Sequence, residues 1–271
     1  MGVIMIVAMA CTKNWYHYLA VNIFSLLRCN DCIDKIYLFV ETDNINEIDR
    51  LKDIVSYFGT DVILINYNKY VFNYIESNSP NYQNRYSTFC FCKLFLSDFI
   101  KEDKVLYIDT DAIVVKSIES LNHINMDKHL ICGVKDIGVV EQEFEYYQSI
   151  GSPNKYVNSG FVLMNLKLMR KKNCIDKFIN LLYEQEYRYP DQDVLNIVCS
   201  DSIKYIHSLF NCTEEAYIQP TRKINNLNLV KCFHFTGLKE DWLADNINAE
   251  IWYTIEDNYF LFLKGLGKKN E

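Results

Sequence analysis

Apolar runs alternate with amphipathic segments through the first third of this chain. Apolar runs typical of strands buried on both faces of a sheet occupy residues 3–9, 35–40 and 62–65 and the stretch that leads into Asp109. Apolar side chains at helical spacing lie between them, in residues 14–27, 46–58 and 85–100. Because strands that alternate with helices form parallel sheets, we predict an α/β fold whose ligands bind beyond the carboxyl ends of the strands.

The second half of the chain is less regular. We expect strands in residues 129–134, 157–165, 204–207 and 230–235, and helices in residues 166–186 and 191–198. With four prolines and nine glycines among 271 residues, no stretch has the composition of a linker. We therefore expect one domain over residues 1–250, followed by an aromatic and basic tail over residues 251–271.

The composition argues against some classes of protein. The net charge of −7 argues against a nucleic-acid partner, since phosphate backbones are bound by basic surfaces. No apolar stretch approaches the roughly eighteen residues that cross a membrane, and the short apolar run at the N-terminus fits a first strand better than a signal peptide. Cys29 and Cys32 have zinc or redox spacing, but no second pair completes a zinc site, so we expect free thiols in a reducing cytoplasm.

Two aspartates, Asp109 and Asp111, lie between two apolar runs of the chain. Buried carboxylates are expensive to desolvate unless something pairs with them. Alternate residues of an extended segment project to the same side, so we expect both carboxylates to converge on one cation. Hard oxygen ligands favour Mg²⁺ or Mn²⁺ over a soft metal. The alternative is a loop in which the two aspartates cap a helix or a turn.

Three later stretches carry polar groups at the expected ends of strands and helices. Asn158 can donate and accept hydrogen bonds, as a sugar hydroxyl requires, although a tight turn also explains residues 158–160. Asp191 follows a proline where a helix N-cap belongs, but capping does not explain the polar residues that come after it. His234 closes an apolar strand, where it is placed to bind a metal or a phosphate, or serves the fold alone.

Taken in order, these motifs resemble those of the family 8 glycosyltransferases, which include glycogenin and the bacterial galactosyl- and glucosyltransferases of lipopolysaccharide synthesis. The resemblance extends from Val3 to Trp242, and it is carried by Asp109-Thr110-Asp111, Asn158-Ser159-Gly160-Phe161, Asp191-Gln192-Asp193-Val194-Leu195-Asn196 and His234-Phe235-Thr236-Gly237. It implies the GT-A fold, a Rossmann-like nucleotide-sugar-binding fold with a mixed, mainly parallel central sheet.

The resemblance also implies a site for a UDP-sugar donor. Asp109, Asp111 and His234 would bind Mn²⁺, or Mg²⁺, against the diphosphate, and Thr110 would lie near the ribose. The resemblance further implies that the donor is contacted by Ala10, Thr12, Asn14, Tyr16, Lys93, Ser159, Gly237 and Lys239.

Asn158 and Asp191 match residues that hold hydroxyls of the donor sugar in this family, and Gln192 matches the residue beside the reacting face. Asp191 and Gln192 are therefore the candidate catalytic residues, whose oxygens would stabilise an oxocarbenium-like sugar. The family retains the anomeric configuration, by same-face attack of the acceptor or through a covalent intermediate. The sequence leaves both routes open, and the poor nucleophilicity of an amide at position 192 favours the first.

Three positions depart from the family pattern. Thr12 stands where bacterial members usually have an aspartate. Lys93 replaces an arginine, which keeps the charge and loses the bidentate fork. Lys239 lies one residue further from Trp242 than the phosphate-binding lysine usually does, so it either reaches the diphosphate from a shifted turn or makes a weaker contact.

We therefore expect a metal-dependent, retaining hexosyltransferase that moves glucose or galactose from a UDP-sugar to a glycan, glycolipid or protein acceptor. One alternative is a sugar-nucleotide hydrolase or a nucleotidyltransferase, although residues 10–14 lack the glycine-rich loop usual in nucleotidyltransferases. Another is a non-catalytic nucleotide-sugar-binding protein. We expect a cytoplasmic location, and the tail either touches the cytoplasmic face of a membrane or, as we favour, forms a packed helix with a solvated end.

Overall fold

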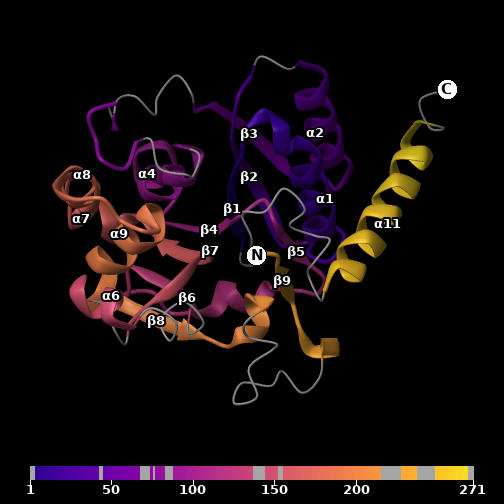
Figure 1. Cartoon of the computed structure of the whole chain (residues 1–271). Coiled ribbons are helices and arrows are strands. Elements are labelled where there is room, and N and C mark those ends of the chain that lie inside the picture. The colour runs from indigo at the N-terminus through magenta and orange to yellow at the C-terminus, as the bar shows by residue number, and fades with distance from the viewer. Residues whose placement is uncertain are drawn as a thin grey trace.

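The computed structural model of the chain describes residues 4–42, 45–67, 74–75, 77–82, 88–136, 144–151, 155–214, 227–236 and 248–267. A seven-stranded sheet crosses the molecule in the order β3-β2-β1-β4-β7-β6-β8 (Figure 1). Its strands are β1 (Met5–Ala10), β2 (Ile33–Val40), β3 (Asp61–Asn66), β4 (Lys104–Ile108), β6 (Ile131–Lys135), β7 (Val157–Asn165) and β8 (Ile203–Ile206). β7 is antiparallel to both β4 and β6, while the other neighbouring pairs are parallel. The predicted α/β fold with a mixed, mainly parallel sheet is confirmed.

Helices cover both faces of this sheet (Figure 1). One face carries α1 (Tyr16–Leu27), α2 (Ile45–Tyr57) and α11 (Ala249–Gly267). The other carries α4 (Cys92–Phe99), α7 (Leu166–Lys171), α8 (Cys174–Glu184) and α9 (Pro190–Cys199). A short helix, α6 (Phe144–Ser149), precedes β7. The described 3₁₀ turns are η1 (Lys13–Trp15), η2 (Thr88–Phe91), η3 (Glu119–His123), η4 (Ser200–Ser202), η5 (Ser208–Phe210) and η7 (Leu227–Leu229).

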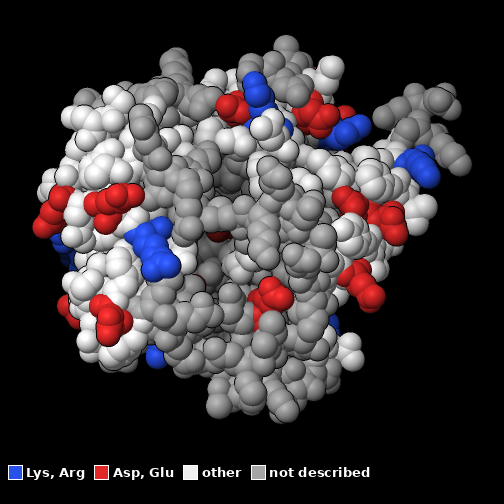
Figure 2. Space-filling view, in the orientation of Figure 1, with Lys and Arg blue, Asp and Glu red and all other residues white. Residues whose placement is uncertain are grey.

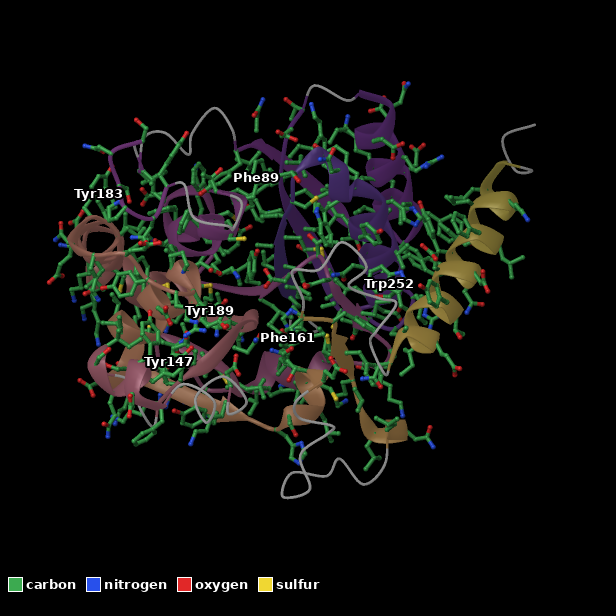
Figure 3. All side chains as sticks on the ribbon, viewed as in Figure 1. Phe89, Tyr147, Phe161, Tyr183, Tyr189 and Trp252 are labelled. Atoms are coloured by element: carbon green, nitrogen blue, oxygen red, sulfur yellow. The ribbon has the colours of Figure 1, made fainter. Side chains whose placement is uncertain are left out.

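β1 shows why the central strands are apolar throughout. Its residues alternate between the two cores: Met5, Val7 and Met9 pack on the α1 side, and Ile6, Ala8 and Ala10 on the α4 side. Since helices cover both faces, neither set of side chains reaches water, and the strand has to be a continuous apolar run. Among the side chains labelled in Figure 3, Phe161 and Trp252 belong to the first core and Phe89 to the second.

The prediction of one helix over residues 166–186 is wrong, because the segment is divided into α7 and α8. Asn173 lies between them with a φ of 49°, in the left-handed region that asparagine tolerates better than most residues. The side chain of Asn165 caps α7 by accepting a hydrogen bond from the amide of Leu168 at 2.9 Å. Apolar spacing continues across the break and therefore conceals it.

A second correction concerns the segment around the two aspartates, which we expected to be one extended strand. β4 ends at Ile108, and a new strand, β5 (Ala112–Val114), begins after a turn at residues 109–111. β5 leaves the large sheet and pairs antiparallel with β9 (Cys232–His234). The two aspartates therefore lie in a turn at the carboxyl end of β4, not within a strand.

The C-terminal helix α11 packs against α1 and projects from the body of the molecule (Figure 1). Trp252 and Tyr259 are buried, and Glu256 pairs with His17 of α1 at 2.5 Å. Among the described helices, none has the length and apolar composition needed to cross a membrane. The division of the chain at residue 250 stays a prediction, and residues 268–271 of the tail lie outside the described part.

Arg170 of α7 fixes the segment that leads into β4. Its guanidinium donates hydrogen bonds to the carbonyl oxygens of Ser97 at 3.2 Å, Ile100 at 2.9 Å, Lys101 at 3.3 Å and Glu102 at 3.2 Å. These carbonyls lie in the last turn of α4 and just beyond it, where partners within the helix are missing. A planar fork of donors suits this task better than the point charge of a lysine.

We expect Arg170→Met, which keeps the apolar stem, to lower the free energy of unfolding by about 2 kcal/mol, because hydrogen bonds from a charged donor are lost. Urea denaturation followed by circular dichroism measures the change. Lys167→Met is the control, because Lys167 of the same helix pairs with Asp103 at the surface, at 3.0 Å, where ion pairs contribute little. Equal destabilisation by the two substitutions would contradict the role given to Arg170.

Candidate active site

Hydrogen bonds from four elements hold the turn at residues 109–111. The amide of Asp109 donates to the carbonyl of Gly160 in β7 at 2.7 Å, and Asn22 of α1 donates to the carbonyl of Asp109 at 2.8 Å. The hydroxyl of Thr110 donates to the carbonyl of Ala10 at the end of β1, at 3.1 Å. Just after β9, the amide of Phe235 donates to the carbonyl of Asp111 at 2.9 Å. Backbone groups and the side chains of Asn22 and Thr110 thus anchor the turn without using either carboxylate.

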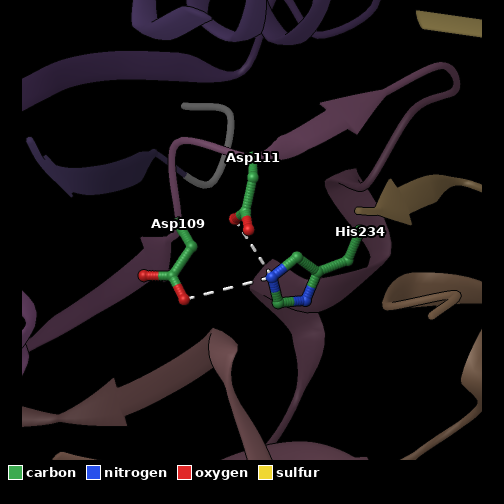
Figure 4. Close-up of side chains that lie close together, drawn as sticks. All are labelled: Asp109, Asp111 and His234. Atoms are coloured by element: carbon green, nitrogen blue, oxygen red, sulfur yellow. Dashed lines mark ion pairs between the residues drawn. The ribbon is translucent and has the colours of Figure 1, made fainter. Parts of the chain in front are cut away.

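Asp109 and Asp111 meet His234 at this turn (Figure 4). His234 arrives from β9, whose register with β5 places it opposite Ala112. Its Nε2 lies 3.2 Å from Oδ1 of Asp111 and 4.0 Å from Oδ2 of Asp109. One ligand atom from each of the three residues lies within 4.8 Å of the others. Two carboxylates and one imidazole form a donor set that suits Mn²⁺, and less well Mg²⁺.

The electrostatics of His234 fit a site that collects positive charge. The ring is buried, which on its own lowers the pKa, but the carboxylate of Asp111 and then that of Asp109 outweigh the burial and raise the pKa above its ordinary value. The two carboxylates therefore favour a cation in their midst, whether a proton on the ring or a metal ion. The residues present fit the metal that the family resemblance implies.

Gly160 makes room for this cluster. A Cβ atom at that position would lie 2.2 Å from Cε1 of His234 and 2.6 Å from Oδ2 of Asp109, closer than atoms can approach. Its φ does not require glycine, so the reason for the glycine is space and not backbone conformation. The groups that approach Gly160 are therefore the side chains of the cluster itself.

We expect Gly160→Ala to displace His234 and Asp109 and to weaken the binding of Mn²⁺ by about 10-fold or more, as changes that disturb ligand placement do. Isothermal titration calorimetry with Mn²⁺ measures the affinity. Gly265→Ala in α11 is the control, since a Cβ atom there meets nothing within 4 Å. If the two variants, both folded by circular dichroism, bound Mn²⁺ equally well, the steric argument would fail.

Lys93 of α4 lies buried between two of the site carboxylates. Its Nζ is 3.2 Å from Oδ1 of Asp109 and 2.8 Å from Oδ2 of Asp191, and it donates to the hydroxyl of Ser159 at 3.1 Å. The ring of Tyr107 lies below it, with its centroid 4.9 Å from Nζ. Burial opposes the ammonium, but the carboxylates of Asp109 and Asp191 outweigh it and raise the pKa of Lys93. The lysine is therefore charged and bridges the turn after β4 to the start of α9.

The described charged residues on the hollowed face of the molecule are of both signs. The face shown in Figure 2 is hollowed near its middle, and part of an acidic side chain is visible inside the hollow. On this face the described lysines and arginines are scattered among aspartates and glutamates. An anionic ligand would therefore depend on local positive charge, of which Lys93 is the described source nearest the cluster.

Asp191 does not cap α9, which corrects our interpretation of it as an N-cap. Tyr189 holds the cap position, Pro190 begins the helix, and no side chain caps it. The carboxylate of Asp191 instead pairs with Lys93 and accepts a hydrogen bond from the hydroxyl of Ser159 at 3.3 Å. Capping thus gives no structural reason for Asp191, and its side chain belongs to the cluster.

Gln192 and Asn158 are held by a residue that we did not single out, Asp136, directly after β6. Oδ2 of Asp136 accepts hydrogen bonds from Nε2 of Gln192 and from Nδ2 of Asn158, both at 3.1 Å. Oε1 of Gln192 accepts from the amide of Ser159 at 2.8 Å, so both ends of its side chain are engaged. The available signal in the sequence was an aspartate that closes an apolar strand, the pattern that also marks Asp109.

Asp193 has a structural role, although it belongs to the same motif. It is completely buried, and its carboxylate accepts hydrogen bonds from the hydroxyls of Tyr146, at 2.7 Å, and Tyr156, and from the amide of Tyr189 at 2.9 Å. Burial raises the pKa of Asp193 to about 6, against the opposing effect of these donors. The residue joins α9 to α6 and β7.

The remaining predicted positions lie around the cluster or outside the description. Thr12 and Asn14 follow β1, and Asn14 is exposed. Tyr16 is buried, and its hydroxyl donates to the carbonyl of Glu41. Gly237 and Lys239, with Trp242, lie outside the described residues. The structure therefore brings together Lys93, Asp109, Asp111, Asn158, Ser159, Asp191, Gln192 and His234, and links Ala10 and Thr110 to them.

The chain is similar to glycosyltransferases of known sequence and structure. The family described as glycosyl transferase family 8 matches residues 6–246. A putative glycosyltransferase of Haemophilus influenzae is 28% identical over 83% of this chain and 69% of its own length. The lipopolysaccharide 1,3-galactosyltransferase of Salmonella typhimurium is 24% identical over 87% of this chain and 72% of its own. The crystal structure of the galactosyltransferase LgtC with donor and acceptor sugar analogues has a TM-score of 0.78, with 23% identity over 94% of this chain and 96% of that one.

Proposed function

The chain belongs to glycosyltransferase family 8, and from this premise we propose that it moves a hexose, glucose or galactose, from a UDP-sugar to a glycan, glycolipid or protein acceptor with retention of configuration. The observation that carries the proposal is the convergence of Asp109, Asp111 and His234 beside a buried, charged Lys93. This site lies at the carboxyl end of β4, where ligands of open α/β sheets bind. Positive charge stabilises a bound diphosphate, and the cluster can bind the cation that supplies this charge.

We assign Mn²⁺, or Mg²⁺, to Asp109, Asp111 and His234. When bound, the ion would neutralise charge that develops on the leaving UDP diphosphate. Lys93, which contacts both carboxylate oxygens of Asp109, supplies a second, fixed positive charge. Because this ammonium is already buried and oriented, it needs little reorganisation when the leaving group forms.

Asp191 and Ser159 are suited to orient the sugar of the donor. The contacts of Asp191 with described residues use Oδ2, for Lys93 and Ser159, so Oδ1 is available to a sugar hydroxyl. Ser159 is fixed in turn, because its hydroxyl accepts from Lys93 while it donates to Asp191. The role of Asn158 in binding the sugar stays part of the proposal.

The surroundings of α9 support same-face attack by the acceptor over a covalent intermediate. The amide of Gln192 is a poor nucleophile and is held by hydrogen bonds at both ends. Asp191 is neutralised by Lys93 at 2.8 Å, and Asp193 is buried among tyrosines. Gln192 is uncharged, the charge of Asp191 is paired, and Asp193 is buried, so none of the three is suited to attack the sugar as a nucleophile.

The test is a UDP-release assay over a panel of sugar nucleotides, with Mn²⁺ or with chelator. We expect turnover with UDP-glucose or UDP-galactose that chelator abolishes and that Asp111→Asn lowers roughly 100-fold or more, because an electrostatic contact to the leaving group is lost. Asp201→Asn, at an exposed aspartate paired with Lys155, is the matched control and should leave turnover unchanged.

Three outcomes would count against this function. Equal turnover with chelator would remove the metal. UDP release that is as fast without an acceptor as with every saccharide or glycolipid tried would favour the alternative of a sugar-nucleotide hydrolase. Binding of UDP with Mn²⁺ but no turnover of any donor would favour a non-catalytic protein.

The membrane contact of the tail and the cytoplasmic location also stay predictions. α11 exposes Tyr253, Phe260 and Leu261, side chains that suit the interface of a bilayer, and buries Trp252 as a packed helix does. All ten cysteines are free thiols, which suits a reducing compartment.

Sedimentation with anionic liposomes separates the two interpretations of the tail. A membrane contact predicts that the double substitution Phe260→Ser and Leu261→Ser, at exposed positions, lowers the bound fraction several-fold while the thermal unfolding midpoint stays the same. If the substituted and unsubstituted proteins sediment alike, the tail is a packed helix with a solvated end.

A further inference from the structure

Asn211 contacts the ring of His234 on the side away from the aspartates. It follows η5 and is 1% exposed. Its Oδ1 lies 2.9 Å from Nδ1 of His234, and its Nδ2 donates to Oδ1 of Asn158 at 2.9 Å. The backbone beside it is fixed to β9, since the amide of His234 donates to the carbonyl of Cys212 at 3.0 Å. Asn211 is thus held rigidly behind the cluster.

The orientation of the Asn158 amide follows from its partners. The backbone amide of Gly160 can only donate, and it donates to one end of this side chain at 3.0 Å. The carboxylate of Asp136 accepts at the other end, at 3.1 Å. The end of Asn158 beside Gly160 is therefore the carbonyl oxygen, and the end beside Asp136 is the NH₂ group.

The same reasoning fixes Asn211 and then His234. Because the carbonyl oxygen of Asn158 accepts, the group of Asn211 that faces it is the NH₂ group. The carbonyl oxygen of Asn211 therefore faces Nδ1 of His234 and accepts its hydrogen. In the neutral ring, this leaves the lone pair of Nε2 directed at the space it shares with Asp109 and Asp111.

We propose that Asn211 is a positioning residue for the metal site: it holds His234 as the Nδ1–H tautomer, so that Nε2 is free to bind the cation. The proposal rests on the metal-dependent function proposed above. Groups that orient a metal-binding histidine through its second nitrogen affect metal affinity almost as strongly as the ligands do. Here the orienting group is a neutral amide, which fixes the ring without adding a third carboxylate to the site.

The chain of amides extends from the cation site to the sugar site. Asn158 accepts from Asn211 and donates to Asp136, which also accepts from Gln192. A change at Asn211 therefore reaches both the ring that binds the metal and the side chain expected beside the reacting sugar. The two halves of the site share one hydrogen-bond network.

The test measures Mn²⁺ affinity by electron paramagnetic resonance of the free ion, in the presence of UDP, for the wild type and Asn211→Leu. Leucine has a similar size and neither accepts nor donates, so we expect binding to weaken by about 10- to 100-fold. Asn211→Asp keeps an acceptor for Nδ1–H and loses the donor to Asn158. It should bind Mn²⁺ close to the wild-type level and unfold at a lower temperature.

Asn81→Leu is the matched control. Asn81 is also buried, and it donates to the carbonyls of Leu182 and Gln185 at 2.7 and 2.8 Å, at the end of α8. It should lose stability as Asn211→Leu does, yet bind Mn²⁺ like the wild type. Wild-type affinity in folded Asn211→Leu, or equal loss in the Leu and Asp variants, would overturn the positioning role. Absence of Mn²⁺ binding by the wild type would instead refute the proposed function.

A second measurement reads the tautomer directly in the unsubstituted protein, and a variant serves only to assign the signals. Nuclear magnetic resonance of protein labelled with ¹⁵N-histidine, loaded with Mg²⁺ and UDP, reports which ring nitrogen carries hydrogen. The chain has five histidines, so the His234 signals can be assigned by their loss in His234→Gln. We expect hydrogen on Nδ1, and hydrogen on Nε2 would overturn the proposal.

Discussion

Like charges gathered at one end of the sheet are the constraint on which the rest of the site depends. Asp109, Asp111 and Asp191 come from two different elements, and carboxylates so close repel unless cations lie between them. Lys93 provides one such charge permanently. His234 adjoins the other pair, where a proton or a metal ion is favoured. One positive charge, on Lys93, is thus part of the protein. The other, beside His234, comes from a proton or metal ion taken up from solution.

Asp109 in the turn after β4, and Asp191 and Asp193 in the first turn of α9, illustrate how environment decides the role of a side chain. Asp109 is partly open and faces both cations. Asp191 is almost covered but keeps one oxygen for a ligand. Asp193, two residues later, points to the other side of its helix, where tyrosine hydroxyls enclose it. Proximity in the sequence says little here, because the helix rotates each successive side chain by about 100°.

The fold could be predicted because burial on both faces forces whole strands to be apolar, as in β1, and this signal is local. The break at Asn173 could not, since a left-handed residue leaves the apolar spacing intact. At the site, Asp109, Asp111, Asn158, Gln192 and His234 were found from their motifs. Asp136 and Asn211 were missed because each is a single polar residue after a short apolar or 3₁₀ segment, and only the tertiary structure shows that they meet the others. The convergence of Asp109 and Asp111 was expected for the wrong reason, strand alternation, while a hydrogen-bonded turn produces it.

The small ladder of β5 and β9 has a consequence for how the protein is made. It joins the segment after Asp109 and Asp111 to the segment that carries His234, and these segments are far apart in the chain. During synthesis, β1, β2, β3 and β4 can assemble long before β9 leaves the ribosome. Until then the two aspartates lie beside Lys93 without the histidine. The full set of two carboxylates and one imidazole therefore forms only after β9 has been synthesised.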